Sequence, residues 1–348
     1  MPCKGDEADL ERNLKAVLHQ DYPNYRTLIV TDSTEDPAYP VAKSALSGQS
    51  GGNSFLYTSD AAVSASGKVA ALLTGLARDR GQADVYAFID SDALVSSRWL
   101  GDLVDPLKDE SVGATTGFRW YFPSRGRFWS YVEAAWNASG TNLLFNDRYN
   151  FPWGGAMAIR AETLEKIGIK QLWTRAVSDD LTLNSALRGR GFRISFLPHC
   201  TVATFNDTGL QHFLEWATRQ TSLTKVFNRG LWKYAATAYA FFDFVFLLAL
   251  VSLVFGVIFA PAWLVPSALL FAPSALGMLR SAQRNSTFSR AMPEFKKEFQ
   301  RTRFKEAVAS LIVPWVMTYC IIKSARTHQI QWRGRIYKLT EMNPLASP

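Results

Sequence analysis

Cysteine is scarce in this chain of 348 residues. The three cysteines, Cys3, Cys200 and Cys320, are widely spaced, and no two of them form a C-x-x-C pair. This number and spacing support neither a disulfide framework nor a structural zinc site. Charged residues are also few, at 20% of the chain, whereas apolar residues reach 48%, with 11 tryptophans and 23 phenylalanines. This composition excludes a disordered chain and favours a folded protein in contact with a membrane, with its folded part in a reducing, cytosol-facing compartment.

An N-terminal signal peptide is also lacking, because residues 1–20 contain no apolar core region. Membrane insertion would then depend on apolar segments further along the chain. Residues 234–279 carry a single charge, Asp243, and Pro261 divides this run into two pieces. Each piece has about the 20 residues that a helix needs to cross roughly 30 Å of hydrocarbon. We therefore predict a transmembrane helical hairpin over 231–280, and a pair of buried core helices is the alternative.

Positive charge is concentrated near the C-terminus. The net charge of the chain is +8, and residues 281–340 hold 12 lysines and arginines against three glutamates, so the rest of the chain is close to neutral. A nucleic-acid-binding protein would show a basic face on its folded domain as well. We expect no nucleic acid partner and favour an anionic lipid bilayer. Basic residues flank the hairpin, and under the positive-inside rule they place both of its ends in the cytoplasm.

Three segments follow the hairpin. Residues 281–306 are basic, and Phe295 and Phe299 stand at helical spacing, which predicts a helix lying at the membrane interface. A solvated charged linker is the alternative. Residues 307–323 form a shorter apolar segment, a third membrane segment that we expect to be re-entrant or interfacial. Residues 324–348 form a basic cytoplasmic tail.

Residues 1–230 show the rhythm of an α/β domain. Apolar spacing predicts alternating helices and strands, with helices over 10–20 and 66–78 and strands over 27–32 and 84–89. Such alternation implies a largely parallel sheet, whose ligands lie at the carboxyl ends of its strands. Asp32, Asp90 and Asp92 all stand at such ends.

The pattern Asp90-x-Asp92 directly follows a buried strand. Two carboxylates in this arrangement offer the hard oxygen ligands that Mg²⁺ or Mn²⁺ prefers. A divalent ion there would neutralise the charge of a departing diphosphate, as the transfer of a sugar from a nucleotide sugar requires. Asp32 is placed to bond the base or ribose, and Lys68, at a helix start, is placed to reach the phosphates or the base of the nucleotide. The alternatives are a solvated turn for the aspartate pair, and an N-cap or a surface charge for Asp32 and Lys68.

A further carboxylate group stands in Ser178-Asp179-Asp180, at a predicted helix start. A sugar transfer must deprotonate the acceptor hydroxyl, and a carboxylate can act as the general base. The alternative is a helix N-cap. Both roles are compatible if Ser178 or Asp179 caps the helix and Asp180 acts as the base.

A third candidate group precedes the hairpin. Trp216, Arg219 and Gln220 lie about one helical turn apart, and Arg219 is suited to hold a diphosphate with two parallel hydrogen bonds. An amphipathic helix that leads to the membrane is the alternative.

Motifs along the chain resemble those of ceramide glucosyltransferase and its bacterial relatives, which are membrane-bound, inverting GT-A glycosyltransferases. They occur in the order PCKGDEADLERNL, DYPNY, Asp32 with EDPA, GKVAAL, the strand-borne DSD, WGGAMAIR, SDDLTL and IQWRGRIYKL, from Pro2 to about Leu339. The resemblance implies that Asp32 and Asp90 contact the nucleotide, that Lys68 lies by the uridine diphosphate, that Asp92 holds the metal and that Asp180 is the base.

Two departures from the family pattern stand out. The family carries Gln or Arg, two further residues and then Arg-Trp, whereas residues 216–220 keep the arginine and change both flanking members. The family also has an apolar strand upstream of its Pro-Cys-Lys-Gly equivalent, whereas this chain begins at Met1. We therefore expect a GT-A domain over 1–230 that lacks its first strand, as in a truncated gene model or a fragment.

The sequence thus predicts an integral protein of the bacterial inner membrane whose catalytic domain faces the cytoplasm. We expect it to transfer a sugar from a nucleotide sugar, such as a UDP-hexose, to the hydroxyl of a ceramide-like or other lipid, with inversion and with Mg²⁺ or Mn²⁺. Two alternatives stay open. One is a processive polysaccharide synthase, which also joins a GT-A domain to membrane helices, and the other is an inactive membrane scaffold derived from a transferase.

Overall fold

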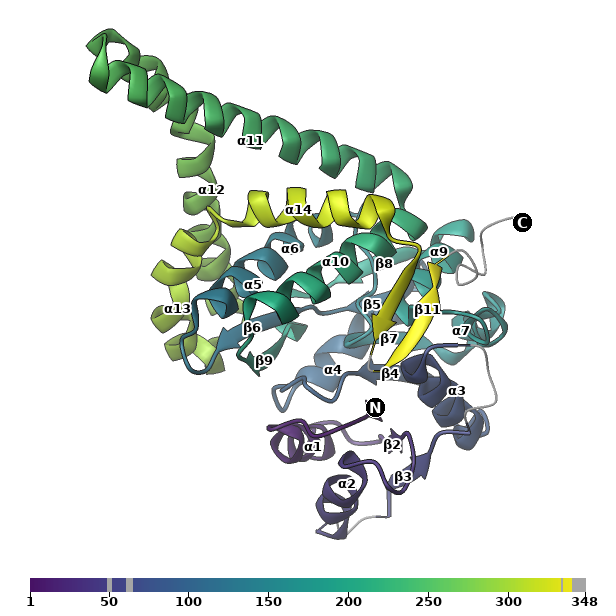
Figure 1. Cartoon of the computed structure of the whole chain (residues 1–348). Coiled ribbons are helices and arrows are strands. Elements are labelled where there is room, and N and C mark those ends of the chain that lie inside the picture. The colour runs from purple at the N-terminus through teal and green to yellow at the C-terminus, as the bar shows by residue number, and fades with distance from the viewer. Residues whose placement is uncertain (49–51, 61–64, 333, 340–348) are drawn as a thin grey trace. The chain divides into compact units, whose positions relative to one another are not determined.

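The chain divides into two compact units. Figure 1 labels most of their helices and strands. The structure, a computed structural model, describes residues 1–48, 52–60, 65–332 and 334–339. Unit 1 comprises Met1–Tyr121, Gly140–Phe205 and Gln331–Pro348, and unit 2 comprises Phe122–Ser139 and Asn206–Ile330. This division differs from the linear one expected from the sequence, because each unit is assembled from separate segments of the chain.

Unit 1 alternates strands with mostly short helices. Its strands are β1 (Pro2–Cys3), β2 (Thr27–Thr31), β3 (Ser54–Thr58), β4 (Val85–Ile89), β5 (Val112–Thr116), β7 (Ala156–Arg160), β8 (Arg193–Phe196) and β11 (Arg335–Lys338), and the strands β6 (Arg119–Pro123), β9 (Val202–Asn206) and β10 (Gln329–Trp332) run across its boundaries. Its helices are α1 (Leu10–Leu18), α2 (Ala38–Ser47), α3 (Gly67–Asp79), α4 (Trp99–Val104), η1 (Asp105–Lys108), α6 (Thr141–Leu144), α7 (Ala161–Lys166), α8 (Ile169–Trp173), α9 (Asp179–Gly189) and η2 (Pro198–Cys200). The helices and strands predicted up to residue 89 are confirmed to within a few residues.

The main strands of unit 1 form a three-stranded and a four-stranded sheet. The first has the order β1-β2-β3 and is parallel throughout. The second has the order β4-β7-β5-β8, in which β7 runs antiparallel to both of its neighbours. The expected parallel arrangement is therefore confirmed for the first sheet and wrong for β7. Pro2 and Cys3 form the two-residue strand β1, which pairs with Val30 and Thr31 at the edge of the first sheet.

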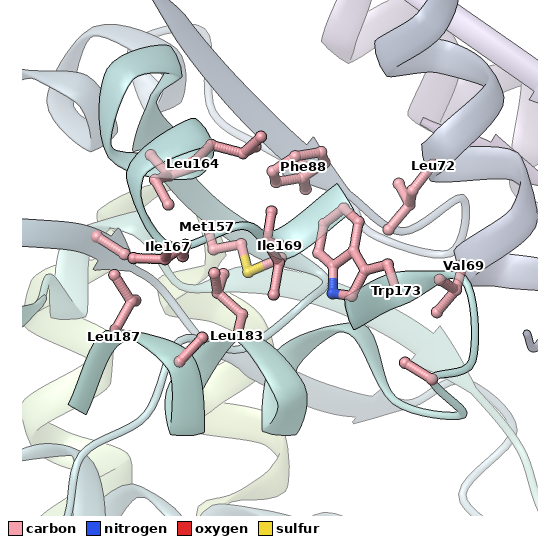
Figure 2. Close-up of a cluster of buried hydrophobic side chains, with 14 of the residues drawn as sticks. Val69, Leu72, Phe88, Met157, Leu164, Ile167, Ile169, Trp173, Leu183 and Leu187 are labelled. Atoms are coloured by element: carbon pink, nitrogen blue, oxygen red, sulfur yellow. The ribbon is translucent and has the colours of Figure 1, made fainter. Parts of the chain in front are cut away.

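Apolar side chains of α3, β4, β7, α8 and α9 meet in one core of unit 1 (Figure 2). The rings of Phe88 and Trp173 meet edge to face, with 5.6 Å between their centroids. The indole N–H of Trp173 donates a hydrogen bond to the carbonyl oxygen of Asp179 at 3.1 Å. Because this core packs α3 and α9 against the sheet, it also fixes the positions of the first residues of both helices.

Serine caps define where these two helices begin. The hydroxyl oxygens of Ser66 and Ser178 accept hydrogen bonds of 3.3 Å from the amides of Val69 and Leu181. Such a cap contributes about 1 kcal/mol to helix stability. The capping role considered for Ser178 is therefore confirmed, and it leaves the carboxylate of Asp180 available for another role.

A glycine between β5 and β6 is required by a close approach of two chain segments. A Cβ on Gly117 would lie 2.0 Å from the carbonyl oxygen and 2.6 Å from the carbonyl carbon of Cys200. Both are backbone atoms of a buried residue, so neither can move aside. We expect Gly117→Ala to lower the free energy of unfolding by about 2 kcal/mol or more, measured as a lower melting temperature of the detergent-purified chain.

Gly189→Ala is the matched control. A Cβ on Gly189 meets no atom within 4 Å, and alanine favours a helix over glycine by roughly 0.5–1 kcal/mol. Equal melting temperatures for Gly117→Ala and the parent would contradict the close approach at Cys200.

Unit 2 is helical. Its helices are α5 (Phe128–Ser139), α10 (Leu210–Phe227), α11 (Arg229–Ile258), η3 (Pro261–Trp263), α12 (Leu264–Ala291), η4 (Pro293–Phe295), α13 (Lys296–Ala309) and α14 (Val313–Arg326). As predicted, α11 and the segment of η3 and α12 are long and apolar enough to cross a membrane, and the second arm continues to Ala291 instead of ending at 280. Large apolar side chains along both helices are exposed, including Phe241, Val257, Leu269 and Leu279. Such a surface suits lipid better than water.

Several polar side chains within these helices are buried. Asp243, the only charged residue of the apolar run, is buried, and the hydroxyl of Thr318 on α14 donates a hydrogen bond to its carboxylate. The hydroxyl of Ser267 on α12 donates to the carbonyl oxygen of Ala249 on α11 at 2.9 Å. Contacts of this kind are needed where polar groups lie at membrane depth.

The segment after the hairpin is folded into unit 2. Phe295 and Phe299 are 6% and 1% exposed, and their rings pack on Phe122 with centroid distances of 5.7 and 5.0 Å. The interfacial orientation expected for these two side chains is wrong, because protein aromatics cover them. α13 and α14 meet at a bend of 64°, which divides the apolar segment predicted over 307–323. α14, with 14 residues, is shorter than the roughly 20 needed to span alone.

Candidate active site

The ends of β4, α3 and α9 bring charged side chains together in unit 1. Asp90 directly follows β4, Lys68 lies in the first turn of α3, and Asp179 and Asp180 begin α9. The ammonium nitrogen of Lys68 lies 2.8 Å from the carboxylate of Asp90 and 3.0 Å from that of Asp179. The structure thus brings Lys68 and Asp90, two of the three residues predicted to bind the nucleotide, together with Asp179 and with Asp180, the predicted base.

Lys68 forms ion pairs with the carboxylates of both Asp90 and Asp179. Its side chain is 16% exposed. Burial by itself would lower the pKa of Lys68, but Asp179, Asp90 and Asp180 together raise it above the ordinary value. Burial raises the pKa of Asp179, and Lys68 acts in the opposite direction. Lys68 therefore stays charged and allows Asp179 to be buried as a carboxylate.

Asp180 is held by hydrogen bonds to both of its oxygens. The amide of Gly154 donates to Oδ2 at 3.3 Å, and the amide of Leu181 donates to Oδ1 at 2.7 Å. The hydroxyl of Ser178 also donates to Oδ1. These bonds fix the orientation of a half-buried carboxylate, which is what a general base needs.

Glycines in the WGG segment let the backbone lie against the cluster. A Cβ on Gly154 would lie 2.1 Å from the carboxylate of Asp179, and one on Gly155 would lie 2.7 Å from that of Asp90. The sequence singled out this segment only through the family resemblance. The structure supplies the physical reason, because these carboxylates, and at Gly155 also the ring of Trp153, occupy the space that a side chain would need.

Arg119, the first residue of β6, is a site residue that the sequence reasoning missed. Its Nη2 lies 2.9 Å from Asp90 Oδ2 and 2.7 Å from Asp92 Oδ1. The guanidinium also lies over the rings of Trp153 and Tyr121, at 4.9 and 5.4 Å from their centroids. Nothing in the local sequence around Arg119 marks it as a partner of the aspartate pair, because the two aspartates lie 27 and 29 residues earlier in the chain and meet Arg119 only in the folded unit.

Asp32 has different partners. Lys4 Nζ lies 2.8 Å from Asp32 Oδ2, and Arg335 Nη2 lies 3.3 Å from Oδ1. The hydrogen bond from Lys4 and the charges of Lys4 and Arg335 lower the pKa of Asp32. The hydroxyl of Tyr337 accepts a 3.4 Å hydrogen bond from the amide of Gly67, next to Lys68. The terminal IQWRGRIYKL motif thus lies beside the start of α3, while its Arg333 falls outside the described residues.

The third predicted group lies on α10 in unit 2. Trp216 packs edge to face on Trp136 of α5, with 4.9 Å between ring centroids, in a core of unit 2. Arg219 and Gln220 follow on the same helix and are half-buried. A role of these residues with the acceptor or the diphosphate stays a prediction.

The aspartate pair has a donor set that suits a divalent cation shared with a ligand. Among the residues that the structure describes, no group of three or more His, Cys, Asp or Glu side chains is placed to hold a metal. Mg²⁺, however, is commonly bound by one or two carboxylates together with substrate phosphates. Asp90 and Asp92 fit this second arrangement, in which a diphosphate completes the ligands.

One sequence-family model covers nearly the whole chain. A sequence model described as glycosyl transferase family 21 matches residues 1–344. The fold is similar to mannosyltransferase PcManGT from Pyrobaculum calidifontis, solved with GDP-Man and Mn²⁺, at 20% identity over 91% of this chain and 85% of that one, with a TM-score of 0.46.

Two further solved structures are similar. Glucosyl-3-phosphoglycerate synthase from Mycobacterium tuberculosis, in complex with phosphoglyceric acid, matches at 17% identity over 61% of this chain and 72% of that one, with a TM-score of 0.40. GalNAc-T7 with UDP, GalNAc and Mn²⁺ matches at 13% identity over 59% of this chain and 43% of that one, with a TM-score of 0.41.

Proposed function

This chain belongs to glycosyl transferase family 21, the ceramide glucosyltransferase family, and on that premise we propose that it transfers a hexose from a UDP-sugar to the hydroxyl of a membrane lipid with inversion at the anomeric carbon. It is a glycosyltransferase with an α/β GT-A domain. The observation that carries the proposal is the placement of Asp180 in the same cluster as Lys68 and Asp90. Donor-binding and proton-accepting groups thereby share one site.

The proposed reaction is a single displacement. The acceptor oxygen bonds to the anomeric carbon from the face opposite the diphosphate, and the bond from that carbon to the diphosphate oxygen breaks. The proton of the acceptor hydroxyl passes to a carboxylate oxygen of Asp180. Because the carboxylate is already oriented by its three hydrogen bonds, little reorganisation is needed when the proton moves.

The other residues of the cluster are assigned to the donor. Lys68 is placed to bind the phosphates, and Asp32 and Asp90 to contact the nucleoside. Asp92, together with Asp90, would hold Mg²⁺ or Mn²⁺. When bound, this cation supplies positive charge for the leaving diphosphate. The protein side chains themselves bind and orient the donor and remove the proton from the acceptor hydroxyl.

A lipid acceptor is favoured by unit 2. Its two long apolar helices expose their large side chains, and basic residues flank the hairpin on both sides. We propose that anionic lipids contact this basic flank and that the catalytic domain faces the cytoplasm of a bacterial inner membrane. Trp216, Arg219 and Gln220 lie on α10, the helix before the first of these two, and we assign them to the acceptor or the diphosphate.

The test supplies purified membranes containing the chain with radiolabelled UDP-sugars, with Mn²⁺, with Mg²⁺ or with EDTA. We expect label to appear in a lipid that migrates on thin-layer chromatography, and EDTA to abolish the labelling. Label that stays at the origin would instead indicate a polysaccharide synthase. No labelled product from any donor would contradict transferase activity and favour an inactive scaffold.

A further inference from the structure

One nitrogen of Arg119 stands between the two carboxylates that are assigned to the divalent cation. The same Nη2 bonds Asp90 Oδ2 at 2.9 Å and Asp92 Oδ1 at 2.7 Å. A cation held by both aspartates would compete with Arg119 for these two carboxylates. Building on the function proposed above, we propose that Arg119 is a resident counter-cation of the Asp90 and Asp92 pair, and that a divalent cation binds the pair only by displacing it together with the incoming diphosphate.

The guanidinium is held in place from several sides. Nη1 of Arg119 donates a 2.8 Å hydrogen bond to the hydroxyl of Tyr121, and the guanidinium lies over the rings of Tyr121 and Trp153. The side chain is only 13% exposed. The cation is therefore packed into the site, and a metal ion must compete with a positioned partner rather than with water.

The charges of the cluster explain why the diphosphate is needed. Four carboxylates, those of Asp90, Asp92, Asp179 and Asp180, face two cations, Lys68 and Arg119. A divalent ion that entered beside Arg119 would meet its charge at close range in a site with little screening. A diphosphate changes this balance, because it brings ligands for the metal and gives the displaced guanidinium a planar, bidentate partner.

Arg119 acts in this scheme as a positioning residue that sets the order of binding. In the parent chain the affinity for the cation alone should be weak, and it should rise strongly when the nucleotide is present. Without the guanidinium, Asp92 loses this cation and Asp90 keeps only Lys68, so the two aspartates should bind the divalent cation more readily without the nucleotide. The factor by which the nucleotide raises the affinity for the cation should then be smaller than in the parent.

The experiment is a Mn²⁺ titration of the detergent-purified full chain, followed by electron paramagnetic resonance of free Mn²⁺, without and with UDP. We expect Arg119→Gln to bind Mn²⁺ at least about tenfold more tightly than the parent when UDP is absent, the change that corresponds to one charge-assisted hydrogen bond. When UDP is present, the Mn²⁺ affinities of Arg119→Gln and the parent should be closer to each other. Equal Mn²⁺ affinities of the two proteins without UDP would overturn the proposal.

Three further variants complete the design. Arg119→Lys keeps the charge and should bind Mn²⁺ without UDP about as weakly as the parent. Arg193→Gln, at an exposed ion pair with Asp109, is the matched control and should leave Mn²⁺ binding unchanged. Tyr121→Phe removes the anchor of Nη1, and because it preserves the cluster it tests the proposal even if Arg119→Gln does not fold. It should raise the Mn²⁺ affinity without UDP, and no change would count against the proposal.

The two proposals fail in different ways. If labelled sugar is transferred to lipid while Arg119→Gln leaves Mn²⁺ binding unchanged, only the counter-cation proposal is lost. If Arg119→Gln tightens Mn²⁺ binding but no donor yields any product, the cation exchange stands and the transferase proposal is lost. Mn²⁺ binding is measured without turnover, so the two readouts are independent.

Discussion

Asp180→Asn is expected to reduce sugar transfer by about 10²–10⁴-fold, the usual contribution of a positioned general base. Asparagine keeps the size of the side chain but cannot accept the proton of the acceptor hydroxyl. Donor binding should stay close to that of the parent, because Lys68 and Asp90 remain. The loss is measured as initial rates of labelled lipid formation, with UDP binding followed by calorimetry on the same preparation.

The matched control for this variant is Asp105→Asn, an exposed aspartate of unit 1 that pairs with Lys108. It should transfer sugar at the parent rate. In Asp180→Asn the NH₂ group can take the place of Oδ2, which accepts the hydrogen bond from the Gly154 amide, and two donors would then face each other. The melting temperature of the variant is therefore recorded as well, to separate a loss of stability from a loss of the base. If the folded variant keeps a tenth or more of the parent rate, Asp180 is not the base.

Lys68→Met should weaken UDP binding more than about tenfold and destabilise unit 1 by about 3–5 kcal/mol, the cost of leaving a buried charge without its partner. The ammonium lies between Asp90 and Asp179, and the side chain of Asp179 is only 5% exposed. Methionine fills the volume without supplying a charge. Calorimetry with UDP and thermal unfolding in detergent measure the two effects.

The destabilisation by Lys68→Met should depend on pH. Burial already raises the pKa of Asp179, and Lys68 acts against this rise. Without Lys68, the pKa of Asp179 in the folded state should rise further. The folded state then binds a proton more tightly than the unfolded state, so stability is retained at low pH and lost as the pH rises through the folded-state pKa. The difference in melting temperature from the parent should therefore be larger at pH 8 than at pH 5.

Lys170→Met serves as the control, because Lys170 pairs with Glu165 at the surface. Exposed ion pairs contribute about 0–1 kcal/mol, so its melting temperature should match that of the parent at both pH values. A Lys68→Met variant whose melting temperature differs from the parent equally at pH 5 and pH 8 would show that Asp179 does not depend on Lys68 for its charge.

Local patterns predicted the elements that carry the site. The apolar spacing of residues 10–18, the short apolar strands before Asp32 and Asp90, and the serine that precedes Asp179 are each contained in a few consecutive residues. Such signals reflect backbone and burial preferences of one segment. The strand β7 was misjudged in direction, because the way a strand enters a sheet depends on its neighbours and on the connection that leads to it.

The environments of Arg119 and of the aromatic residues in the 281–306 segment could not be predicted from local patterns. Phe295 and Phe299 stand at helical spacing with basic residues around them, which suits a membrane interface and a protein core equally well. In the structure both rings pack on Phe122, so they belong to a protein core. Arg119 carries no local signal at all, since its two aspartate partners lie 27 and 29 residues earlier in the chain.

By itself, the amino-acid order determined that an α/β region precedes two long apolar helices, and it determined which short segments carry carboxylates at their ends. Only the tertiary structure decided that Lys68 would separate Asp90 from Asp179, that Arg119 would bridge Asp90 and Asp92, and that Arg335 would reach Asp32 from 303 residues away. The physical reason is that helix and strand preferences act over a few residues, whereas the partner of a buried charge is chosen by the packing of whole elements.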